Sequence, residues 1–533
     1  MGGKARVIHE YGDAPAIQLP AVADEAEISS SSFLIVSLAF VRLFVHVLTS
    51  ALGGYGYFRD ELYYIACSEH LAWGYVDHPP LSILILAMNR LVLGDSLVAL
   101  RFLPALAGAA SVYVTGLMVR ELGGRKFAIS LACLAVIIAP AYLAIAGFYS
   151  MNAFDLLFWN ILLFLLLVIL KHGRQEVWLL FGLVAGLGLM NKISVLFLGF
   201  GLVIGLLLTP ERIVLRRKWI WLGGLIAALI VLPNIVWQIV YGWPTLEFIE
   251  QAQRYKIASM GPVEFLLGQV EYLHPLVFPI WVAGLWYFFF HPDGKQYRLF
   301  GWMYAVIFVF LVVQNSKVYY LAPIYTILIA AGGVIIQQWI EQRGRKWMKP
   351  VLIALLALGG IATVPLTVPI LPVESFIRYA RVVGIEPRAE ENNPLGALPQ
   401  LYADCFGWEE LTATVVSVHR GLSPKDQSRS LIYTQNYGEA GALNFFGRHF
   451  GLPRVVSGHN NYFLWGPGTD SVHAVIIVGG EEEDHLRAFE NVQRAGVSVC
   501  TYCMPYENNL PIFVARGLKV PLDEAWSSTK HYN

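Results

Sequence analysis

Long apolar runs alternate with short polar segments from residue 33 to residue 370. Most runs have roughly 17–23 residues, which is the length of helix that crosses the hydrocarbon core of a bilayer. The pattern predicts a polytopic α-helical membrane protein with about 11–13 transmembrane helices. We place these helices at 33–52, 97–119, 127–147, 152–170, 176–190, 193–209, 219–240, 273–290, 299–313, 318–337 and 349–370.

The lysine and arginine residues of the short loops lie mainly on one side of this predicted bundle. Because basic loops stay cytoplasmic, the N-terminus is predicted to be inside and the protein to be a multi-pass protein of the inner (plasma) membrane. Residues 79–93 are apolar but short for a crossing, and counting them as a span would put the basic loops outside. We therefore expect a juxtamembrane or re-entrant helix there, within an outer loop from 53 to 96.

The composition changes after residue 370, where the chain becomes polar enough to be soluble. Residues 431–434 and 472–478 are typical of short buried strands, and 438–450 and 481–495 of the helices that follow them. This predicts three parts, namely a cytoplasmic polar tail (1–31), a transmembrane domain (32–372) and a small extracytoplasmic α/β domain (373–533).

The composition excludes several classes of function and site. The 533 residues are 56% hydrophobic and 14% charged, and 38 basic residues balance 38 acidic ones, so we expect no nucleic acid as a partner. Residues 1–31 lack the basic segment and cleavage site of a signal peptide, which predicts that the first helix is retained. Cys500 and Cys503 form a lone CxxC without a second pair. Zinc is therefore not expected, and a local disulfide and two inert thiols both remain open.

Ionisable residues gather on the predicted outer face. Asp60 and Glu61 open the first outer loop, and ionisable groups at such depth are candidates for a functional site by default. Arg42 and His46 are four residues apart on one face of the first helix. The remaining candidates are Asp77, His78, Asp155, Lys192 and Lys317.

Carboxylates beside cations suit the transfer of a group from a lipid with an anionic leaving group. A carboxylate can take the proton of an attacking hydroxyl, and Lys or Arg can hold the departing phosphate. Structural roles compete with these functions: Lys192 and Lys317 could be snorkelling anchors, and Asp155 could cap its own helix. Arg42 and His46 could be a structural polar pair, and the loop around Asp60 a solvated segment with aromatic anchors.

Several motifs resemble glycosyltransferase family 39. They are Asp60-Glu-Leu-Tyr-Tyr64, Val76-Asp-His-Pro-Pro80, an acidic residue opening the fourth helix and Lys317-Val-Tyr-Tyr-Leu-Ala-Pro323, with further likeness in 435–446, 457–467 and 505–511. The family is the bacterial branch related to dolichyl-phosphate-mannose–protein mannosyltransferases and to the aminoarabinose transferase of lipid A. The resemblance implies a GT-C fold, a polyprenyl-phosphate-linked sugar as donor, inversion at the anomeric carbon and an active site under a soluble domain.

By position, the resemblance implies that Asp60 is the catalytic acid of the first loop, with Glu61 beside it and Asp155 as a second acid. Lys317, Tyr319 and Tyr320 would lie near the lipid phosphate. We add Lys192 and Arg42 as phosphate candidates, and Asp77, His78 and His46 as residues that bind the acceptor or shape the site. No cofactor is certain, and a divalent metal remains possible.

Two other functions compete with a glycosyltransferase. A polytopic transporter or lipid flippase would also have many helices and buried charges, but the two halves show no convincing internal repeat. A receptor or assembly factor would leave Asp60, Glu61 and Asp155 unexplained. The partners predicted are a polyprenyl-phosphate-linked sugar, membrane lipid and an extracytoplasmic acceptor: lipid A, another envelope glycan, a lipid or a protein. The sugar and the acceptor themselves cannot be identified from the sequence.

Overall fold

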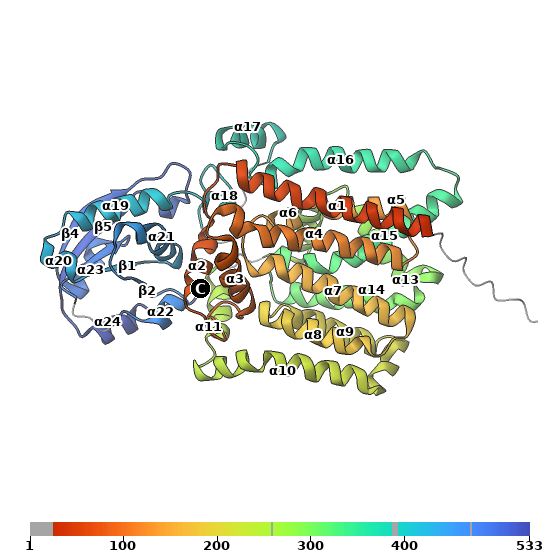
Figure 1. The fold of residues 1–533 in the computed structure, drawn as a ribbon, viewed down its shortest axis with the longest axis horizontal. Coiled ribbons are helices and arrows are strands. Elements are labelled where there is room, and N and C mark those ends of the chain that lie inside the picture. The colour runs from red at the N-terminus through yellow and green to blue at the C-terminus, as the bar shows by residue number, and fades with distance from the viewer. Residues whose placement is uncertain (1–24, 257–259, 386–392, 469–471) are drawn as a thin grey trace, which may run out of the picture.

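A computed structural model describes residues 25–256, 260–385, 393–468 and 472–533. Most of the predicted polar tail therefore lies outside the described residues. A bundle of helices makes up one side of the molecule, and a smaller domain containing a β-sheet is packed against one end of it (Figure 1). We call that end of the bundle the domain end. It carries the short helices α2 (Arg59–Glu69) and α3 (Leu81–Leu93).

Helices occur at all the predicted membrane positions, and α3 forms where a juxtamembrane helix was expected. The bundle consists of α1 (Glu25–Leu52), α4 (Leu97–Glu121), α5 (Lys126–Ile138), α6 (Pro140–Ile145), α7 (Met151–His172), α8 (Val177–Asn191), α9 (Val195–Leu207), α10 (Lys218–Val240), α12 (Pro262–Leu273), α13 (Phe278–Phe290), α14 (Arg298–Val313), α15 (Tyr325–Gln342) and α16 (Met348–Thr367). The short helix α11 (Pro244–Gln251) and the 3-10 helix η4 (Val318–Ile324) connect parts of the bundle.

The number of full-length spans is lower than the eleven helices placed from the sequence. Among the described residues, seven helices are long and apolar enough to cross a membrane, and nine if each of two bent pairs is one span. The predicted helix 127–147 is broken before Pro140, because proline has no N–H to continue the helical ladder. Helices α12 and α13 bend by 114° relative to each other. The chain is a multi-pass membrane protein.

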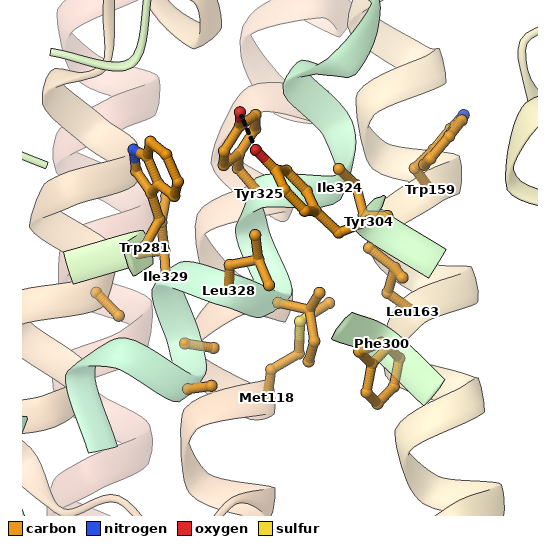
Figure 2. Close-up of a cluster of buried hydrophobic side chains, with 14 of the residues drawn as sticks. Met118, Trp159, Leu163, Trp281, Phe300, Tyr304, Ile324, Tyr325, Leu328 and Ile329 are labelled. Atoms are coloured by element: carbon orange, nitrogen blue, oxygen red, sulfur yellow. Dashed lines mark hydrogen bonds between the residues drawn. The ribbon is translucent and has the colours of Figure 1, made fainter. Parts of the chain in front are cut away.

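The interior of the bundle is a continuous apolar core. Figure 2 shows part of it, where side chains of α4, α7, α13, α14 and α15 converge. Within this core the hydroxyls of Tyr304 and Tyr325 lie 3.0 Å apart and share a hydrogen bond. The backbones also approach closely. A Cβ added at Gly332 of α15 would lie 1.9 Å from the carbonyl oxygen of Ile280 on α13, so only glycine permits this crossing.

The smaller domain is an α/β domain, as predicted. Its five-stranded sheet has the order β2-β1-β3-β5-β4, in which β1 pairs in parallel with both β2 and β3 and the other pairs are antiparallel. The strands are β1 (Ser430–Thr434), β2 (Val455–Ser457), β3 (Ala474–Val478), β4 (Phe489–Ser498) and β5 (Leu510–Leu518). The helices of this part are α17 (Val373–Val383), α18 (Gln400–Ala403), α19 (Trp408–Arg420), α20 (Pro424–Ser428), α21 (Tyr437–Gly447), α22 (Asn461–Trp465), α23 (Glu482–Ala488) and α24 (Leu522–Ser528).

One sequence prediction in this domain was wrong. The helix expected over 481–495 ends at Ala488, and the rest of the segment is strand β4. Because β4 lies at the sheet edge and is mostly exposed, its residues lack the alternating apolar pattern of a half-buried strand. Its position is set by pairing with β5, which the local sequence does not reveal. Cys500 and Cys503 are both free thiols and both buried.

Candidate active site

Glu61, in the first turn of α2, fixes this helix in the protein. Its side chain is completely buried, and its carboxylate accepts hydrogen bonds from the N–H groups of Phe58 (2.9 Å) and Tyr149 (2.8 Å). Arg101 of α4 donates two further bonds, from Nε (2.9 Å) and Nη2 (2.8 Å). All of these contacts serve to hold α2 against α4 and the start of α7, since a buried carboxylate needs such partners.

Asp60, the next residue back along the chain, has a different environment. Its side chain is 37% exposed, and Oδ1 accepts a 2.9 Å hydrogen bond from the hydroxyl of Tyr437 on α21. Arg59 lies beside both residues, with Nε 3.8 Å from Asp60 Oδ1 and Nη2 donating to the Tyr437 hydroxyl at 3.1 Å. Asp60 is therefore positioned by the smaller domain and keeps part of its carboxylate accessible.

Asp77 and His78 lie near the same surface of α2. The hydroxyl of Tyr63 donates to Asp77 Oδ1 at 2.9 Å, and His78 Nε2 is 3.8 Å from that oxygen. The His78 ring is buried against Tyr64 and Tyr75, with centroid distances of 4.7 and 4.9 Å. Burial, with the negative charge of Asp77 next in importance, raises the pKa of Tyr63 and of Tyr64 well above the ordinary value. Both hydroxyls therefore stay protonated at neutral pH, and that of Tyr63 donates to Asp77.

A second cluster surrounds Lys192, which follows the last residue of α8. Its ammonium lies 3.7 Å from Asp155 Oδ2 and donates to Asn152 Oδ1 at 2.7 Å. It also lies over two aromatic rings, 5.6 Å from the centroid of Tyr319 and 4.9 Å from that of Tyr320. Lys317, immediately before η4, is half-buried at the end of the same segment. Three residues that the sequence proposed for the site, Asp155, Tyr319 and Tyr320, thus surround the Lys192 ammonium.

Asp155 is nearly fully buried in the first turns of α7. It accepts a 2.5 Å hydrogen bond from Ser194 Oγ, which in turn accepts one from Trp159 Nε1 at 3.2 Å. The cap of α7 is instead Ser150, whose hydroxyl accepts from the N–H of Asn152. The alternative role of Asp155 as a helix cap is therefore taken by another residue.

The segment 149–152 connects the two clusters. The N–H of Tyr149 donates to Glu61, and the N–H of Met151 donates to the hydroxyl of Tyr64 at 3.4 Å. On the other side, Asn191 donates from Nδ2 to the carbonyl of Met151 at 2.9 Å. The two clusters, one on α2 and one on α7 and α8, therefore meet along a single stretch of chain at the domain end.

Arg42 and His46 lie apart from these contacts, inside the bundle. The two Nη atoms of Arg42 donate to the carbonyls of Ile137 (2.7 Å) and Tyr142, on either side of the break between α5 and α6. Arg42 therefore links the end of α5 to α6 across the break through their backbone carbonyls. Both ring nitrogens of the buried His46 lack a hydrogen-bond partner among the described residues.

The sequence did not single out Arg59, Arg101 and Tyr437, or a pair of carboxyl groups beside them. Glu439 and Glu507 are both buried, and the Asn436 side-chain amide donates to each of them, at 3.0 and 2.9 Å. Burial raises the pKa of Glu507 to about 7, although the positive charge of Arg59 opposes the shift. Burial and the charge of Glu507 raise the pKa of Glu439 well above the ordinary value. The sequence signals were two motifs, one at 435–446 with Asn436, Tyr437 and Glu439, and one at 505–511 with Glu507.

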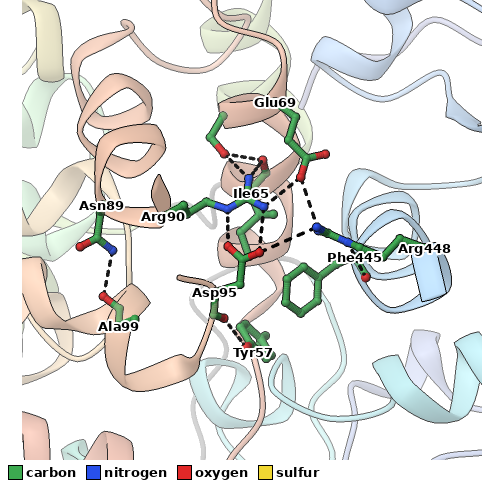
Figure 3. Close-up of polar contacts among 10 residues, drawn as sticks. Tyr57, Ile65, Glu69, Asn89, Arg90, Asp95, Ala99, Phe445 and Arg448 are labelled. Carbon is green, nitrogen blue, oxygen red and sulfur yellow. Dashed lines mark hydrogen bonds and ion pairs between the residues drawn. The ribbon is translucent and has the colours of Figure 1, made fainter. Parts of the chain in front are cut away.

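Ion pairs join the smaller domain to the domain end beside this site. In Figure 3, Arg90 of α3 lies between Glu69 and Asp95, and Arg448 of the smaller domain reaches the same two carboxylates. The hydroxyl of Tyr57 donates to the carbonyl of Asp95 at 2.6 Å. Next to this network lies a cavity of about 430 Å³. It is lined by Asp95, Glu409, Thr412, Ala413, Phe445, Phe446, Arg448, His449 and Phe450.

No group of three or more His, Cys, Asp or Glu side chains in the described part of the chain is arranged to hold a metal ion. The acidic residues are instead matched with cations or hydroxyl donors, as with Glu61 and Arg101, Asp155 and Lys192, and Asp60 and Tyr437. The chemistry that this arrangement supports is proton transfer at a half-exposed carboxylate near a cation that can hold an anion.

A bundle of membrane helices with charged residues gathered beneath a smaller α/β domain is the arrangement of a GT-C fold. Residues 77–237 match the family described as dolichyl-phosphate-mannose-protein mannosyltransferase. ArnT from Cupriavidus metallidurans has a similar fold in its apo state (TM-score 0.59, 15% identity, 91% of this chain and 98% of that chain). The same holds for ArnT bound to undecaprenyl phosphate (TM-score 0.57, 16% identity, 90% and 97% coverage).

A lipid A galacturonosyltransferase, RgtD of Rhizobium johnstonii, is 24% identical to the chain over 314 residues. The match spans 58% of this chain and 64% of that protein. Together these likenesses confirm the resemblance to glycosyltransferase family 39 that the sequence motifs indicated.

Proposed function

We propose that this protein transfers a sugar from a polyprenyl-phosphate donor to an acceptor hydroxyl at the domain end of the bundle. The observation that carries the proposal is that two features lie at this end of the bundle. One is the half-exposed carboxylate of Asp60, and the other is the cluster in which the Lys192 ammonium lies over the rings of Tyr319 and Tyr320. RgtD acts on lipid A, and one ArnT structure contains undecaprenyl phosphate. The lipid A of the first protein is consistent with an envelope acceptor, and the undecaprenyl phosphate of the second with a lipid-linked donor.

In the proposed reaction the oxygen of the acceptor hydroxyl attacks the anomeric carbon, and the bond from that carbon to the phosphate oxygen breaks. Asp60 accepts the hydroxyl proton, and the polyprenyl phosphate leaves with the bonding electron pair. One displacement of this kind inverts the anomeric configuration. Phosphate is a good leaving group, so no strong acid is required on the donor side.

Lys192 is our first candidate for the group that stabilises the departing phosphate. Its position over Tyr319 and Tyr320 and beside Asp155 orients the ammonium before any ligand is bound. Preorganised charge of this kind lowers the barrier without reorganisation during the reaction. Lys317, which the sequence favoured over Lys192, becomes the second candidate, because it opens the segment that carries both tyrosines.

The two adjacent acids are assigned different roles. Asp60 is proposed as the base, and Glu61, with its oxygens occupied by Arg101 and two backbone N–H groups, as a positioning residue. Asp77 and His78 lie beside Tyr63 and Tyr64 and are proposed to shape the acceptor side. For Arg42 we propose a structural role, since both Nη atoms are used by backbone carbonyls.

The cavity of about 430 Å³ beside Asp95 is proposed to receive the sugar portion of the acceptor. Its volume lies within the range of about 300–1,000 Å³ usual for small-molecule sites. The rings of Phe446 and Phe450 offer apolar faces, and the carboxylates of Asp95 and Glu409 can accept hydrogen bonds from sugar hydroxyls. The ring centroids of Tyr57 and Phe445, a lining residue of the cavity, are 4.8 Å apart. Because Tyr57 lies three residues before Asp60, the cavity is close to the proposed base.

We further propose that the basic loops are cytoplasmic and that the smaller domain lies outside the inner membrane, so that the sugar is added to an envelope component. Mass-spectrometric profiling of envelope glycolipids and glycans tests this function in cells with the gene, without it, and with Asp60→Asn in its place. One glycan should lose a sugar in the second and third strains. An unchanged profile in the deletion strain would contradict the proposal.

A further inference from the structure

A second cavity lies at the opposite end of the bundle from the smaller domain. Its volume is about 500 Å³, and its lining includes Arg125, Lys126 and Lys349 with a single carboxylate, Glu341. Among the described lining residues, basic side chains therefore outnumber acidic ones. These residues come from the start of α5, the end of α15 and the start of α16, which lie on the side of the bundle away from the β-sheet domain in Figure 1.

Neighbouring side chains hold one cation of this cavity and cap the helix beside it. Lys349 Nζ donates to Glu341 Oε1 at 2.7 Å and lies 5.4 Å from the ring centroid of Phe127. The oxygen of the Gln337 amide accepts from the N–H groups of Arg125 (3.3 Å) and Ala128 (3.0 Å). The first turn of α5 is thus already capped, and the charged side chains around it are not needed to satisfy its backbone.

Two of these cations stand where the helix itself disfavours them. Arg125 is the N-cap residue of α5 and Lys126 its first residue, yet the N-terminus of a helix carries a partial positive charge. Basic side chains at that position repel the helix dipole unless an anion lies between them. An anion bound in the cavity would be attracted by the helix terminus and by the side chains together.

The surface next to the cavity suits an acyl chain. Helix α5 packs against α1 and against α16, and Phe127, Ser130 and Leu134 on its outward side are only partly covered. These three positions are spaced by three and four residues, so they form one continuous stripe along the helix. The stripe begins at Phe127, which also lines the cavity, and runs from there toward the middle of the bundle.

We propose that this cavity binds the phosphate headgroup of an acidic phospholipid whose acyl chain follows the stripe on α5. Basic pockets between helices at a membrane surface recognise such headgroups through charge and hydrogen bonding. The site is separate from the proposed sugar transfer, and it anchors the ends of α5, α15 and α16 in the leaflet on that side.

The test uses full-length protein in detergent and native mass spectrometry with added phosphatidylglycerol, or with phosphatidylcholine of the same acyl chains. Wild type should retain phosphatidylglycerol selectively, and the double variant Arg125→Gln/Lys126→Gln should retain it about 10-fold less well. The matched control is Arg216→Gln/Arg217→Gln, which removes two exposed charges between α9 and α10 and should behave like wild type. The single variant Lys349→Gln provides a second test if the double variant does not fold.

Equal losses in the cavity variant and the control would overturn the proposal, because the attraction would then be diffuse surface charge. Equal retention of the two lipids by wild type would also overturn it. A third arm adds inorganic phosphate at millimolar concentration. Displacement of the bound phosphatidylglycerol by inorganic phosphate alone would show a site for a soluble anion and contradict the lipid assignment.

Discussion

The hydroxyl of Tyr437, in the first turn of α21, donates a 2.9 Å hydrogen bond to Oδ1 of Asp60 on α2. The two residues are 377 positions apart in sequence. The smaller domain therefore completes the environment of the carboxylate that we propose as the base. The same hydroxyl accepts from Arg59, so it fixes one oxygen of Asp60 and leaves the other for the acceptor.

Replacing Tyr437 with Phe should lower the turnover number about 10-fold, since a hydrogen bond to a charged group is worth about 1.5–3 kcal/mol. The KM for the polyprenyl donor should change little, because Tyr437 does not contact the Lys192 cluster. Tyr462→Phe is the matched control, since the Tyr462 hydroxyl accepts from Asn444 within the smaller domain. Equal rates of sugar transfer by Tyr437→Phe and wild type would show that the smaller domain does not contribute to catalysis through Tyr437.

Glu61 and Arg101 should prove important for stability. Arg101→Met leaves the carboxylate of Glu61 buried without its cation, and breaking a buried pair in this way typically costs about 3–5 kcal/mol. We expect a large fall in melting temperature and in the yield of folded protein, measured by thermal denaturation in detergent. Asp60→Asn should leave both unchanged. If Arg101→Met melted like wild type but were inactive, Glu61 would belong to the chemistry.

Lys192→Met should weaken binding of the polyprenyl-phosphate donor about 10- to 100-fold, through the loss of a charged hydrogen bond to phosphate. Because the change also leaves Asp155 without its cation, we compare it in an Asp155→Asn background, where that cost is absent. Lys317→Met provides the comparison at the second candidate. Weakened donor binding in Lys317→Met alone would exchange the roles of the two lysines.

The stability of the protein should fall as the pH rises from about 5 to 8. The folded pKa of Glu507 is about 7 and burial raises that of Glu439 as well, so the folded protein binds protons that the unfolded chain releases near its ordinary pKa of about 4.3. A carboxyl with a raised folded pKa gives its full stabilisation below the unfolded pKa and loses it up to the folded pKa. The slope is up to about 1.4 kcal/mol per pH unit for each proton.

Glu507→Gln removes one of these titrations and should make the melting temperature less dependent on pH, with the largest gain over wild type at pH 8. The control Glu482→Gln, at an exposed position of α23, should keep the wild-type dependence. Thermal denaturation of the full-length protein at several pH values measures both. If the melting temperature of Glu507→Gln depended on pH as strongly as that of wild type, Glu507 would not bind the extra proton in the folded protein.

Local patterns were sufficient for the membrane bundle and for most of the α/β domain. Apolar runs located the helices, and the charge of loops such as 343–349 decided that 79–93 was not a span. One error came from a missing local signal, since the edge strand β4 has no alternating pattern. The other had a local signal, because Pro140 marks the break inside a run that is otherwise continuously apolar.

The roles within the site were harder to predict, because they depend on distant partners. Asp60 and Glu61 are adjacent and chemically alike, and only Arg101, which is 40 residues from Glu61, separates a buried acid from an accessible one. Likewise, Lys192 and Lys317 both read as anchors at helix ends. The two tyrosines that face Lys192 distinguish them, and these follow it by more than a hundred residues.

The most direct test of the account is the rate of sugar transfer by purified Asp60→Asn. The change keeps the shape of the side chain and removes its ability to take a proton. General-base catalysis is typically worth about 10²–10⁴-fold, so the variant should lose at least about 100-fold in turnover while its melting temperature and its affinity for the donor stay at the wild-type values. Transfer at near the wild-type rate would contradict Asp60 as the base, even though the resemblance to family 39 would remain.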